Sequence, residues 1–491
     1  MANEVELKLA LPETAQRSFL RHPLLREARD KRAARLVILY YDTPDLALWQ
    51  HGIALRLRRQ GGTWLQTVKA AGESAAGLTA RPEWETPYDG RFDFAAVDDA
   101  RVRARLERPK IASRLEPIFE TSFLRTTWQL DGVMLMLDRG WIVSAGRREA
   151  ISELELELAG GDIGALMRLA EHLAERLPLA PAMLSKAERG YRLFKALPPS
   201  PVKAEAIAID VDKLPPAEAF RQIAFSCLEH LQRNRDGAIT SDDPEYIHQM
   251  RVGTRRLRAC LRLFRPVLTE QFIDAVLQPL RPLMDVLGRA RDLDVLLAEI
   301  ASPVTAALPT EPRLAALAGI IADRRYRARA EAIQLLASRQ YGQLTLKIAA
   351  LLHAFTAGGE SAATLDEFAS GRLRRLGRKV QRLALAARPD DPVALHVLRI
   401  GIKRLRYAIE FFTPPNAGKA RRRQAERLAQ VQTTLGQLND LASAGRLLMD
   451  CAGEDLQLRE AVTLIGGWHG PRHARLVEQL PALLADLRGQ A

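Results

Sequence analysis

The chain has 491 residues, too many for a single ordinary core, so we expect two to four domains. Three cysteines without metal-like spacing suggest neither a disulfide framework nor a zinc site, which fits a reducing cytoplasm. The N-terminus lacks a signal-peptide signature and there is no long apolar run, so we expect a cytoplasmic protein without membrane spans. The net charge of +13 is uneven, because residues 1–200 hold 30 Lys and Arg against 27 Asp and Glu, whereas the remainder holds 42 against 32.

The first expected strand, residues 4–9, alternates charged and aliphatic side chains. Successive side chains of a strand point to opposite faces, so Glu4, Glu6 and Lys8 share one face. Two carboxylates beside an ammonium suit a divalent cation that carries an anionic ligand, because Mg²⁺ and Mn²⁺ prefer oxygen ligands and phosphate attracts lysine. A solvated strand face is the alternative, since such alternation is ordinary in antiparallel sheets.

Residues 1–200 are predicted to be mainly strands. Helices are expected over residues 11–22, 162–177 and 182–196, and strands at 36–41, 53–59, 64–70, 83–85, 119–129, 133–137 and 153–158, with a hairpin turn at Gly61-Gly62. Many of these strands have one apolar and one charged face, with Arg and Glu where Thr and Lys are usual. A closed antiparallel barrel with a charged interior and helices outside would explain this pattern.

Five motifs occur in the order found in CYTH domains, so residues 1–200 resemble this family. The motifs are Glu4-x-Glu6-x-Lys8, Leu55-Arg56-Leu57-Arg58, Glu83-x-Glu85, Glu153–Glu157 and Ser185–Tyr191. The ordered set is far more specific than any one motif. The resemblance implies a triphosphate tunnel metalloenzyme, with an N-terminal closed antiparallel β-barrel and flanking helices in an α+β chain.

The resemblance also implies roles for the charged residues. Phosphate oxygens would be held by Lys8, Arg56, Arg58, Lys69, Arg125 and Lys186. The activating Mg²⁺ or Mn²⁺ would be held by Glu4, Glu6, Glu153 and Glu155. The same tunnel would be lined by Glu83, Glu85, Asp138 and Glu157, which could serve a second metal. Carboxylates among six cations should be ionised at neutral pH. The group that takes the proton from water is left open, with Glu4 and Glu6 as candidates.

The second part of the chain contains a repeat. A stiff, proline-rich linker over residues 201–216 precedes long helical periodicities rich in Ala, Leu and Arg. Residues 248–258 recur as 396–406, and residues 287–293 recur as 435–441, both with an offset of 148. Two motifs with one offset indicate duplication. An all-α region over residues 217–491 is therefore expected, built from two similar helical bundles at about 217–360 and 361–491 with pseudo-two-fold symmetry.

Each copy of the longer motif places basic side chains on one helical stripe. The stripes are His248, Arg251, Arg255 and Arg258, and His396, Arg399, Lys403 and Arg406, while Arg256 and Arg404 fall off them. The stripes lack acidic partners at i+4, which favours an anion-binding surface over a solvated basic face. A lone histidine without a second ligand nearby does not indicate a metal site.

The duplicated region, roughly residues 217–491, resembles the CHAD domain, a histidine-containing helical module often fused to CYTH. The resemblance implies a basic pore or groove between the bundles that binds inorganic polyphosphate through the two stripes. An excess of basic residues indicates a polyanion as partner, and charge alone leaves nucleic acid, an anionic membrane and polyphosphate open. Nucleic acid is less favoured because base-contacting aromatics are not found near the stripes.

The leading interpretation is a metal-dependent inorganic triphosphatase that hydrolyses tripolyphosphate to diphosphate and phosphate, with a polyphosphate-binding C-terminal module. The alternatives are a nucleoside or thiamine triphosphatase, a CYTH-type adenylate cyclase, and a non-catalytic protein of polyphosphate granules. The intact set of charges argues against the last. We expect the protein to lie in the cytoplasm, either free or at such granules. The sequence does not determine the preferred metal or the oligomeric state.

Overall fold

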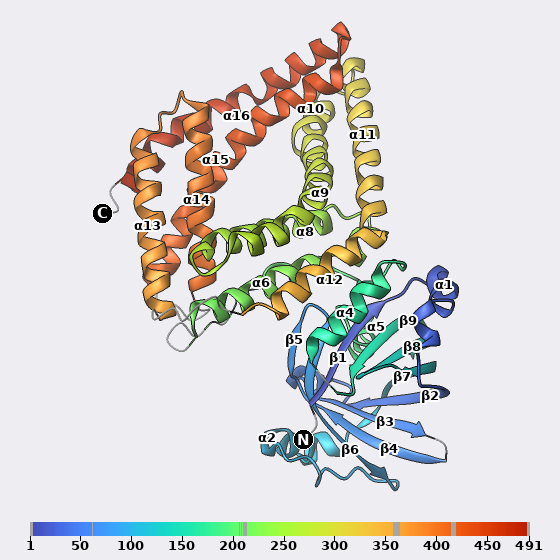
Figure 1. Ribbon diagram of the computed structural model, residues 1–491. Helices are drawn as coiled ribbons and strands as arrows, with labels where there is room; N and C mark the ends of the chain where they lie inside the picture. The colour runs from blue at the N-terminus through green and yellow to red at the C-terminus, as the bar shows by residue number, and fades with distance from the viewer. Residues whose placement is uncertain are drawn as a thin grey trace. The chain divides into compact units, whose positions relative to one another are not determined.

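The computed structural model (Figure 1) describes residues 3–60, 62–160, 162–205, 207, 209, 214–356, 364–413 and 419–488. The chain divides into two compact units. One is Met1–Ser200 together with Ala337–Ala354, and the other is Pro201–Leu336 together with Phe355–Ala491. The first unit therefore contains the predicted barrel region and one segment from the middle of the predicted helical region.

The first unit consists of strands with a few helices. Its strands are β1 Asn3–Ala10, β2 Asp30–Asp42, β3 Ala54–Gln60, β4 Thr63–Lys69, β5 Glu73–Ala75, β6 Leu78–Tyr88, β7 Glu116–Gln129, β8 Val133–Ser144, β9 Arg147–Leu158 and β10 Ala180–Pro181. Its α-helices are α1 Gln16–Leu20, α2 Ala100–Leu106, α3 Pro109–Ala112, α4 Ile163–Ala174, α5 Lys186–Phe194 and α12 Arg339–His353. The helix predicted over residues 11–22 is shorter in the structure, where α1 ends just before Pro23.

Among the described residues, eight strands close into an antiparallel barrel. The order is β1-β9-β8-β7-β2-β3-β4-β6, and β6 pairs back with β1. The predicted barrel and the α+β class are thus confirmed. The register sets charged residues of neighbouring strands opposite one another, for example Lys8 opposite Glu155 and Lys69 opposite Glu83. Residues directly opposite point to the same side of a sheet, so these charges share the inner face.

Helix α5 packs on the apolar part of the same inner face. Tyr40 of β2 stacks on Phe119 of β7 with ring centroids 4.4 Å apart, and Tyr191 of α5 meets Phe119 edge-on at 5.1 Å. A Cβ on Gly190 would lie 2.1 Å from the Phe119 ring, so only glycine allows this approach. The barrel interior is therefore filled by α5 in one region and lined by charges in the other.

Helix α12 belongs to the first unit although its sequence lies far from the barrel strands. It packs on α4 and β10. Arg339 and Gln343 donate hydrogen bonds to the carbonyls of Glu175 (3.2 Å) and Ala174 (3.1 Å), where α4 ends. At Gly342 the two backbones are so close that a Cβ would lie 1.9 Å from the carbonyl oxygen of Leu179.

This close approach makes Gly342 intolerant of any side chain. Gly342→Ala is expected to lower the melting temperature of the full chain, since overpacking typically costs about 1–3 kcal/mol. Gly319→Ala is the matched control, because Gly319 is an exposed glycine of helix α11 (Pro312–Ala337) with no atom within 4 Å of its added Cβ among the described residues. The control should keep or raise the melting temperature. Equal shifts in the two variants would contradict the tight contact.

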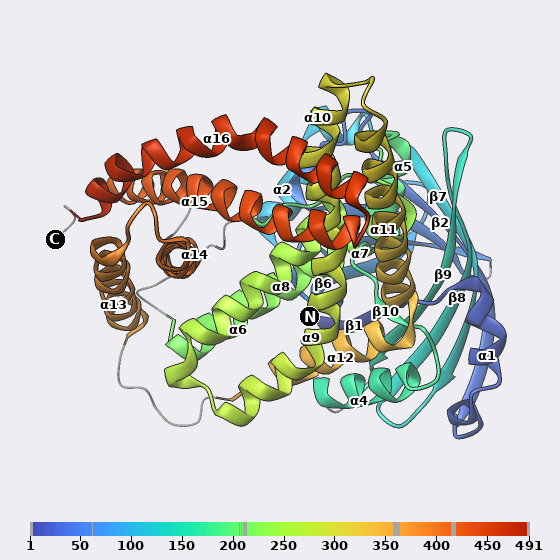
Figure 2. The same cartoon turned by 90° about the horizontal axis from the view of Figure 1, so that it is seen from above.

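Helices are the only regular secondary structure in the described part of the second unit. Its α-helices are α6 Pro216–Arg233, α7 Arg235–Thr240, α8 Glu245–Leu263, α9 Glu270–Val295, α10 Ser302–Ala307, α11, α13 Leu365–Ala386, α14 Pro392–Phe412, α15 Lys419–Ala452 and α16 Leu456–Arg488, with a π-helical stretch at Leu296–Ala301. Helices α13 and α14 lie side by side, as do α15 and α16 (Figures 1 and 2). No helix in the described part of the chain is both long and apolar enough to cross a membrane.

Contacts within this unit repeat with the offset found in the sequence. Arg251 of α8 lies 3.5 Å from Asp292 of α9, and Arg399 of α14 lies 3.8 Å from Asp440 of α15. Both members of the second pair follow those of the first by 148 residues. The duplication predicted from the sequence therefore recurs as a repeated side-chain contact.

The two copies nevertheless share a core. Leu296, Val304 and Leu317 of the first copy pack in one hydrophobic cluster with Leu448 and Ile465 of the second. Helices α15 and α16 have 34 and 33 residues, whereas α13 and α14 of the same copy have 22 and 21. The two longer helices therefore extend past the two shorter ones. Their extending ends are covered by the first copy. The copies thus do not form two independent bundles.

Candidate functional site

Three buried carboxylates of neighbouring strands converge inside the barrel. They are Asp138 of β8 and Glu153 and Glu155 of β9, and ligand oxygens from all three lie within 4.8 Å of one another. Asp138 stands directly opposite Glu153 in the register, and Glu155 follows two residues later on the same face. An all-oxygen, anionic donor set of this kind fits a hard divalent cation.

The sequence-predicted metal set is distributed differently in the structure. Glu153 and Glu155 are together, joined by Asp138, which the sequence analysis assigned to the tunnel lining. Glu6 lies with another group, where it contacts Lys8 and accepts hydrogen bonds from Arg81 and Thr79 at 3.2 Å each. The backbone of Glu4 is part of β1, but its side chain lies outside the described residues.

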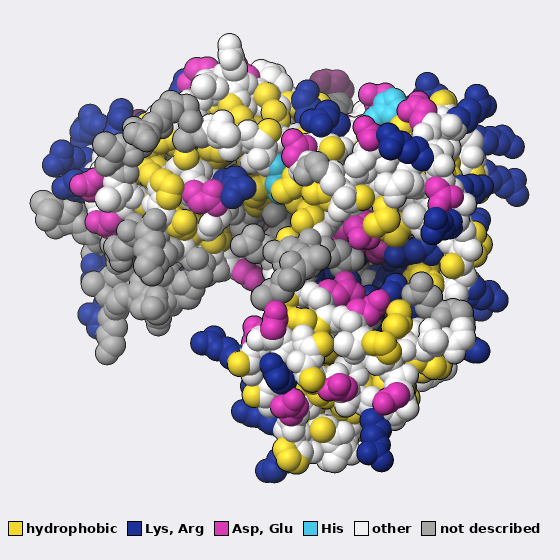
Figure 3. All heavy atoms as spheres, turned by 60° about the horizontal axis from the view of Figure 1, so that its bottom comes forward, with side chains coloured by type: hydrophobic (Ala, Val, Ile, Leu, Met, Phe, Trp, Pro, Cys, Tyr) yellow, Lys and Arg dark blue, Asp and Glu magenta, His cyan; other side chains and the backbone are white. Residues whose placement is uncertain are grey.

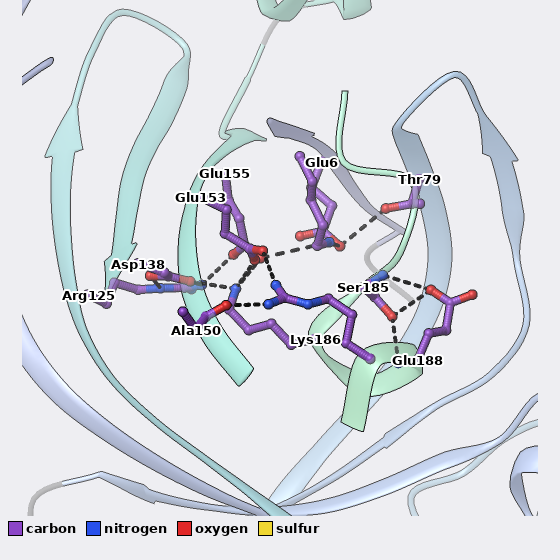
Figure 4. Close-up of polar contacts among 12 residues, drawn as sticks. Glu6, Thr79, Arg125, Asp138, Ala150, Glu153, Glu155, Ser185, Lys186 and Glu188 are labelled. Atoms are coloured by element: carbon purple, nitrogen blue, oxygen red, sulfur yellow. Dashed lines mark hydrogen bonds and ion pairs between the residues drawn. The ribbon is translucent and has the colours of Figure 1, made fainter. Parts of the chain in front are cut away.

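Two predicted cations contact the three carboxylates (Figure 4). Arg125 of β7 donates from Nε and Nη2 to the two oxygens of Asp138, at 2.8 and 2.7 Å, and also contacts Glu155. Lys186, the first residue of α5, lies 2.6 Å from Asp138 and 2.9 Å from Glu155 and also contacts Glu153. A capping box between Ser185 and Glu188 fixes this end of α5, and with it the backbone of Lys186.

These contacts determine the ionisation of the cluster. Burial alone would raise the pKa of Glu155, but the charges of Lys186 and Arg125 outweigh burial and hold that pKa well below its usual value. Burial would lower the pKa of Lys186, but the three carboxylates hold it well above its usual value. Both groups are therefore charged at neutral pH, as expected from the sequence.

The other predicted tunnel residues line the opposite strands. Glu83 of β6 pairs with Arg56 at 3.0 Å and with Lys69 at 2.7 Å, and Glu85 pairs with Arg58 at 2.8 Å. The remaining two members are Lys8, 3.9 Å from Glu155, and Glu157, opposite Glu6 in the register. The barrel thus brings together every predicted tunnel residue whose side chain is described.

Sequence reasoning missed three polar residues of this interior. Arg81 and Thr79 of β6 contact Glu6, and their alternation with Glu83 and Glu85 could have revealed them. Arg189 of α5 lies within the quoted Ser185–Tyr191 motif. It donates to Glu149 at 2.6 Å and lies 3.4 Å from Glu153.

An open cavity of ≈ 380 Å³ adjoins this interior. Three cations line it, namely Lys8, Lys69 and Arg81, and its walls include Trp49 and Met183. An anion that enters through this cavity therefore meets ammonium and guanidinium groups before it reaches the three carboxylates.

In the second unit, the predicted stripes border two cavities. The first, of ≈ 350 Å³, is lined by His248, Arg251, Arg255, Arg399 and Lys403, and also by the acidic residues Asp292, Glu299 and Asp440. Of the other stripe residues, Arg258 lines the second cavity. His396 is exposed, with Nδ1 2.9 Å from Asn439 Oδ1, and neither it nor Arg406 is among the described lining residues of the two cavities.

The second cavity, which we term the basic groove, has a volume of ≈ 990 Å³ and lies between α8, α13 and α14. Its basic lining residues are Arg255, Arg258, Arg262, Arg265, Arg372, Arg375, Lys379, Arg382, Lys403 and Arg404, and Glu270 is the only acidic one among the described residues. The buried Nε atoms of Arg372 and Arg404 have no hydrogen-bond partner in the described part of the chain. Such donors are free to bind a water molecule or an anion.

The groove results from a difference between the two copies. Arg256 of α8 is 1% exposed and pairs with Glu410 of α14 at 2.8 Å. The corresponding positions of the other pair are Arg404 and Arg262, so two arginines stand where the first pair has opposite charges. Both of these arginines line the groove. Of the two residues that fall off the stripe, Arg256 therefore contributes to the core and Arg404 to the basic surface.

Comparison with known proteins finds two families, one over the barrel strands and one over most of the helical region. The sequence matches the CYTH domain family over residues 2–191 and the CHAD domain family over residues 222–449. It is 30% identical over 198 residues to an inorganic triphosphatase of Haemophilus influenzae, which covers 39% of this chain and 55% of that protein. A protein of Mycobacterium tuberculosis described as uncharacterized is 27% identical over 489 residues, covering 92% of this chain and 90% of that protein. The crystal structure of the CHAD domain from the plant Ricinus communis covers 60% of this chain and 98% of that chain, with 34% identity and a TM-score of 0.52.

Proposed function

Because this chain belongs to the CYTH and CHAD families, we propose that its barrel is a metal-dependent inorganic triphosphatase and that its basic groove binds inorganic polyphosphate. The observation that carries the first part is the cluster of Asp138, Glu153 and Glu155 inside a closed barrel whose inner face also carries the cations Lys8, Arg56, Arg58, Lys69, Arg81 and Arg125. The similarity to an inorganic triphosphatase supports the choice of substrate.

In this proposal, Asp138, Glu153 and Glu155 hold Mg²⁺ or Mn²⁺. A bound metal ion would neutralise charge on the leaving phosphate and orient the attacking water. The chain's own cations bind the substrate: Lys8 and Lys69 hold phosphate oxygens as point charges, and Arg56, Arg58 and Arg125 hold them through planar donor forks. Arg81 extends this set toward the cavity. Glu83 and Glu85 keep Arg56, Lys69 and Arg58 oriented until phosphate replaces them.

The deciding experiment measures phosphate release from tripolyphosphate, ATP and thiamine triphosphate, each with Mg²⁺, Mn²⁺ or EDTA. We expect release from tripolyphosphate to be fastest and to be lost in EDTA. Faster release from ATP or thiamine triphosphate would assign the barrel to an organic triphosphate. Formation of cyclic AMP would indicate a cyclase, and no turnover of any substrate would leave a binding protein.

Binding of polyphosphate to the groove is supported by shape and charge. A linear polyanion offers closely spaced identical charges, and the groove offers cations from three helices with one acidic residue among its described lining. The groove contains few groups that could read a base, because Tyr407 is the only aromatic residue in that lining and its hydroxyl accepts a 2.6 Å hydrogen bond from Arg255.

The affinity of the groove for polyphosphate is expected to fall as the pH rises through about 8. Burial, followed by the charges of Arg399 and Arg255, lowers the pKa of Lys403 to about 8. Bound phosphate favours the charged lysine, so the contribution of Lys403 is present below this pKa and is lost above it. We expect about a three- to tenfold loss of affinity between pH 7 and pH 9, measured with the full chain and long-chain polyphosphate in EDTA.

Lys403→Arg is the control for this pH dependence. Arginine keeps its charge throughout this range, so the variant should bind with nearly the same affinity at both pH values. A variant that still loses affinity as the pH rises would show that another group is responsible.

A further inference from the structure

The ammonium of Lys186 lies at the point where the three carboxylates converge (Figure 4). Its Nζ is 2.6 Å from Asp138 Oδ2 and 2.9 Å from Glu155 Oε1, and it contacts Glu153 Oε1. The side chain is 8% exposed, so water does not share this position freely. The lysine therefore stands at the centre of the candidate metal site.

Two arginines also contact these carboxylates, mostly at the outer oxygens, which Lys186 does not contact. Arg125 donates to Asp138 Oδ1 at 2.8 Å and contacts Glu155 Oε2, and Arg189 lies 3.4 Å from Glu153 Oε2. Arg125 also donates to the inner oxygen Asp138 Oδ2 at 2.7 Å, which it shares with Lys186. The contacts to the outer oxygens can remain when a different cation takes the centre. The inner oxygens thus remain aimed at one position, whichever cation occupies it.

We propose that Lys186 is the internal counter-ion of the metal site, which offsets part of the charge of the three carboxylates until a divalent cation displaces its ammonium toward the phosphate-binding side of the barrel. The proposal rests on the metal site of the proposed function. Oxygen ligands approach Mg²⁺ to about 2.1 Å, so a metal ion and an ammonium cannot share the same three oxygens. Their like charges would also repel each other strongly in this buried position.

The side chain of Lys186 is suited to such a movement. Four methylene groups allow its ammonium to change position while the capping box keeps the backbone in place. The displaced ammonium would gain a new partner in the phosphate of the substrate. Metal binding and phosphate binding would then support each other, because each favours the same position of Lys186.

Metal affinity in the absence of substrate tests this competition. Lys186→Met removes the competing ammonium, so it should bind Mn²⁺ about tenfold more tightly than the unmodified protein, or tighter still, measured by isothermal titration calorimetry on the full chain. Lys69→Met is the matched control, because Lys69 is also a buried barrel lysine but pairs with Glu83 at 2.7 Å rather than with the cluster. Its Mn²⁺ affinity should stay within about twofold of the unmodified protein.

Thermal unfolding provides a second readout. In EDTA, Lys186→Met should melt at a lower temperature than the unmodified protein, because it leaves three buried carboxylates with one cation fewer. Adding Mn²⁺ should raise the melting temperature of Lys186→Met by more than it raises that of Lys69→Met. Equal or weaker Mn²⁺ affinity in Lys186→Met would overturn the proposal.

A measurement on the unmodified chain covers the case in which Lys186→Met does not fold. Mn²⁺ without substrate should increase the rate at which acetic anhydride acetylates Lys186, read by mass spectrometry, and should leave the rate at Lys69 unchanged. An unchanged or lower rate at Lys186 would overturn the proposal. These readouts do not depend on catalysis. If the unmodified protein is inactive but Lys186→Met binds Mn²⁺ more tightly, only the triphosphatase assignment is refuted. An active protein without these effects would refute the counter-ion alone.

Discussion

Glu155→Gln is expected to lower phosphate release from tripolyphosphate by about 10³-fold at saturating Mg²⁺. Glu155 contacts both Lys186 and Arg125 and contributes an oxygen to the carboxylate cluster. Its pKa is held well below the usual value, so the carboxylate is fully charged at neutral pH and the amide removes a whole charge. The substitution keeps the shape of the side chain and opens no cavity.

Glu120→Gln is the control for this experiment. Glu120 lies on β7, a strand of the same barrel, but it stands between Phe119 and Thr121, whose side chains face inward, so its own side chain points outward. The control should keep the activity of the unmodified protein. Retention of more than a tenth of the activity in Glu155→Gln would remove this carboxylate from the metal site.

The second large effect is expected in the basic groove. Reversing Arg258 of α8 and Arg375 of α13 to Glu should weaken binding of long-chain polyphosphate on the order of 10²-fold at moderate salt. The two arginines lie on different walls of the groove, and each reversal replaces attraction with repulsion. Binding is measured on the full chain in EDTA, which prevents metal-dependent hydrolysis.

Reversing Arg327 and Arg446 to Glu changes the net charge by the same amount. Both residues are exposed in the second unit, and neither is among the described residues that line the groove. Lys and Arg side chains also project elsewhere on the molecule, between acidic ones (Figure 3), so a purely diffuse attraction would respond equally to either pair. Equal losses would therefore contradict a defined groove.

The sequence was sufficient to predict the barrel and most of its inner face. Alternation with a period of two assigns Glu6, Lys8, Arg56 and Arg58 to one side of their strands, and charges on that side call for a polar interior. The partner of each charge could not be predicted, because it depends on the register between strands. Asp138 joins the metal cluster since β8 sets it opposite Glu153, and no pattern within β8 reveals this pairing.

In the helical region, too, the sequence predicts which side chains share a face but not which contacts they make. Helical periodicity grouped His248 with Arg251 and His396 with Arg399, and the offset of 148 revealed the duplication. Neither the periodicity nor the offset reveals which arginines are buried, because burial depends on helices far away in the sequence. Arg256 is buried in the core, where its Nε donates to Glu410, a residue 154 positions away in the sequence.

Helix α12 has a consequence for how this chain can be divided. Residues 337–354 lie in the first unit, while the residues before and after them belong to the second, so the polypeptide passes between the units three times. A chain cut in the proline-rich linker would lack α12 and would leave bare the surface of α4 and β10 on which this helix packs. The barrel of this protein is therefore not a separable cassette: a fragment ending near residue 200 would lack a structural part that is encoded more than a hundred residues downstream.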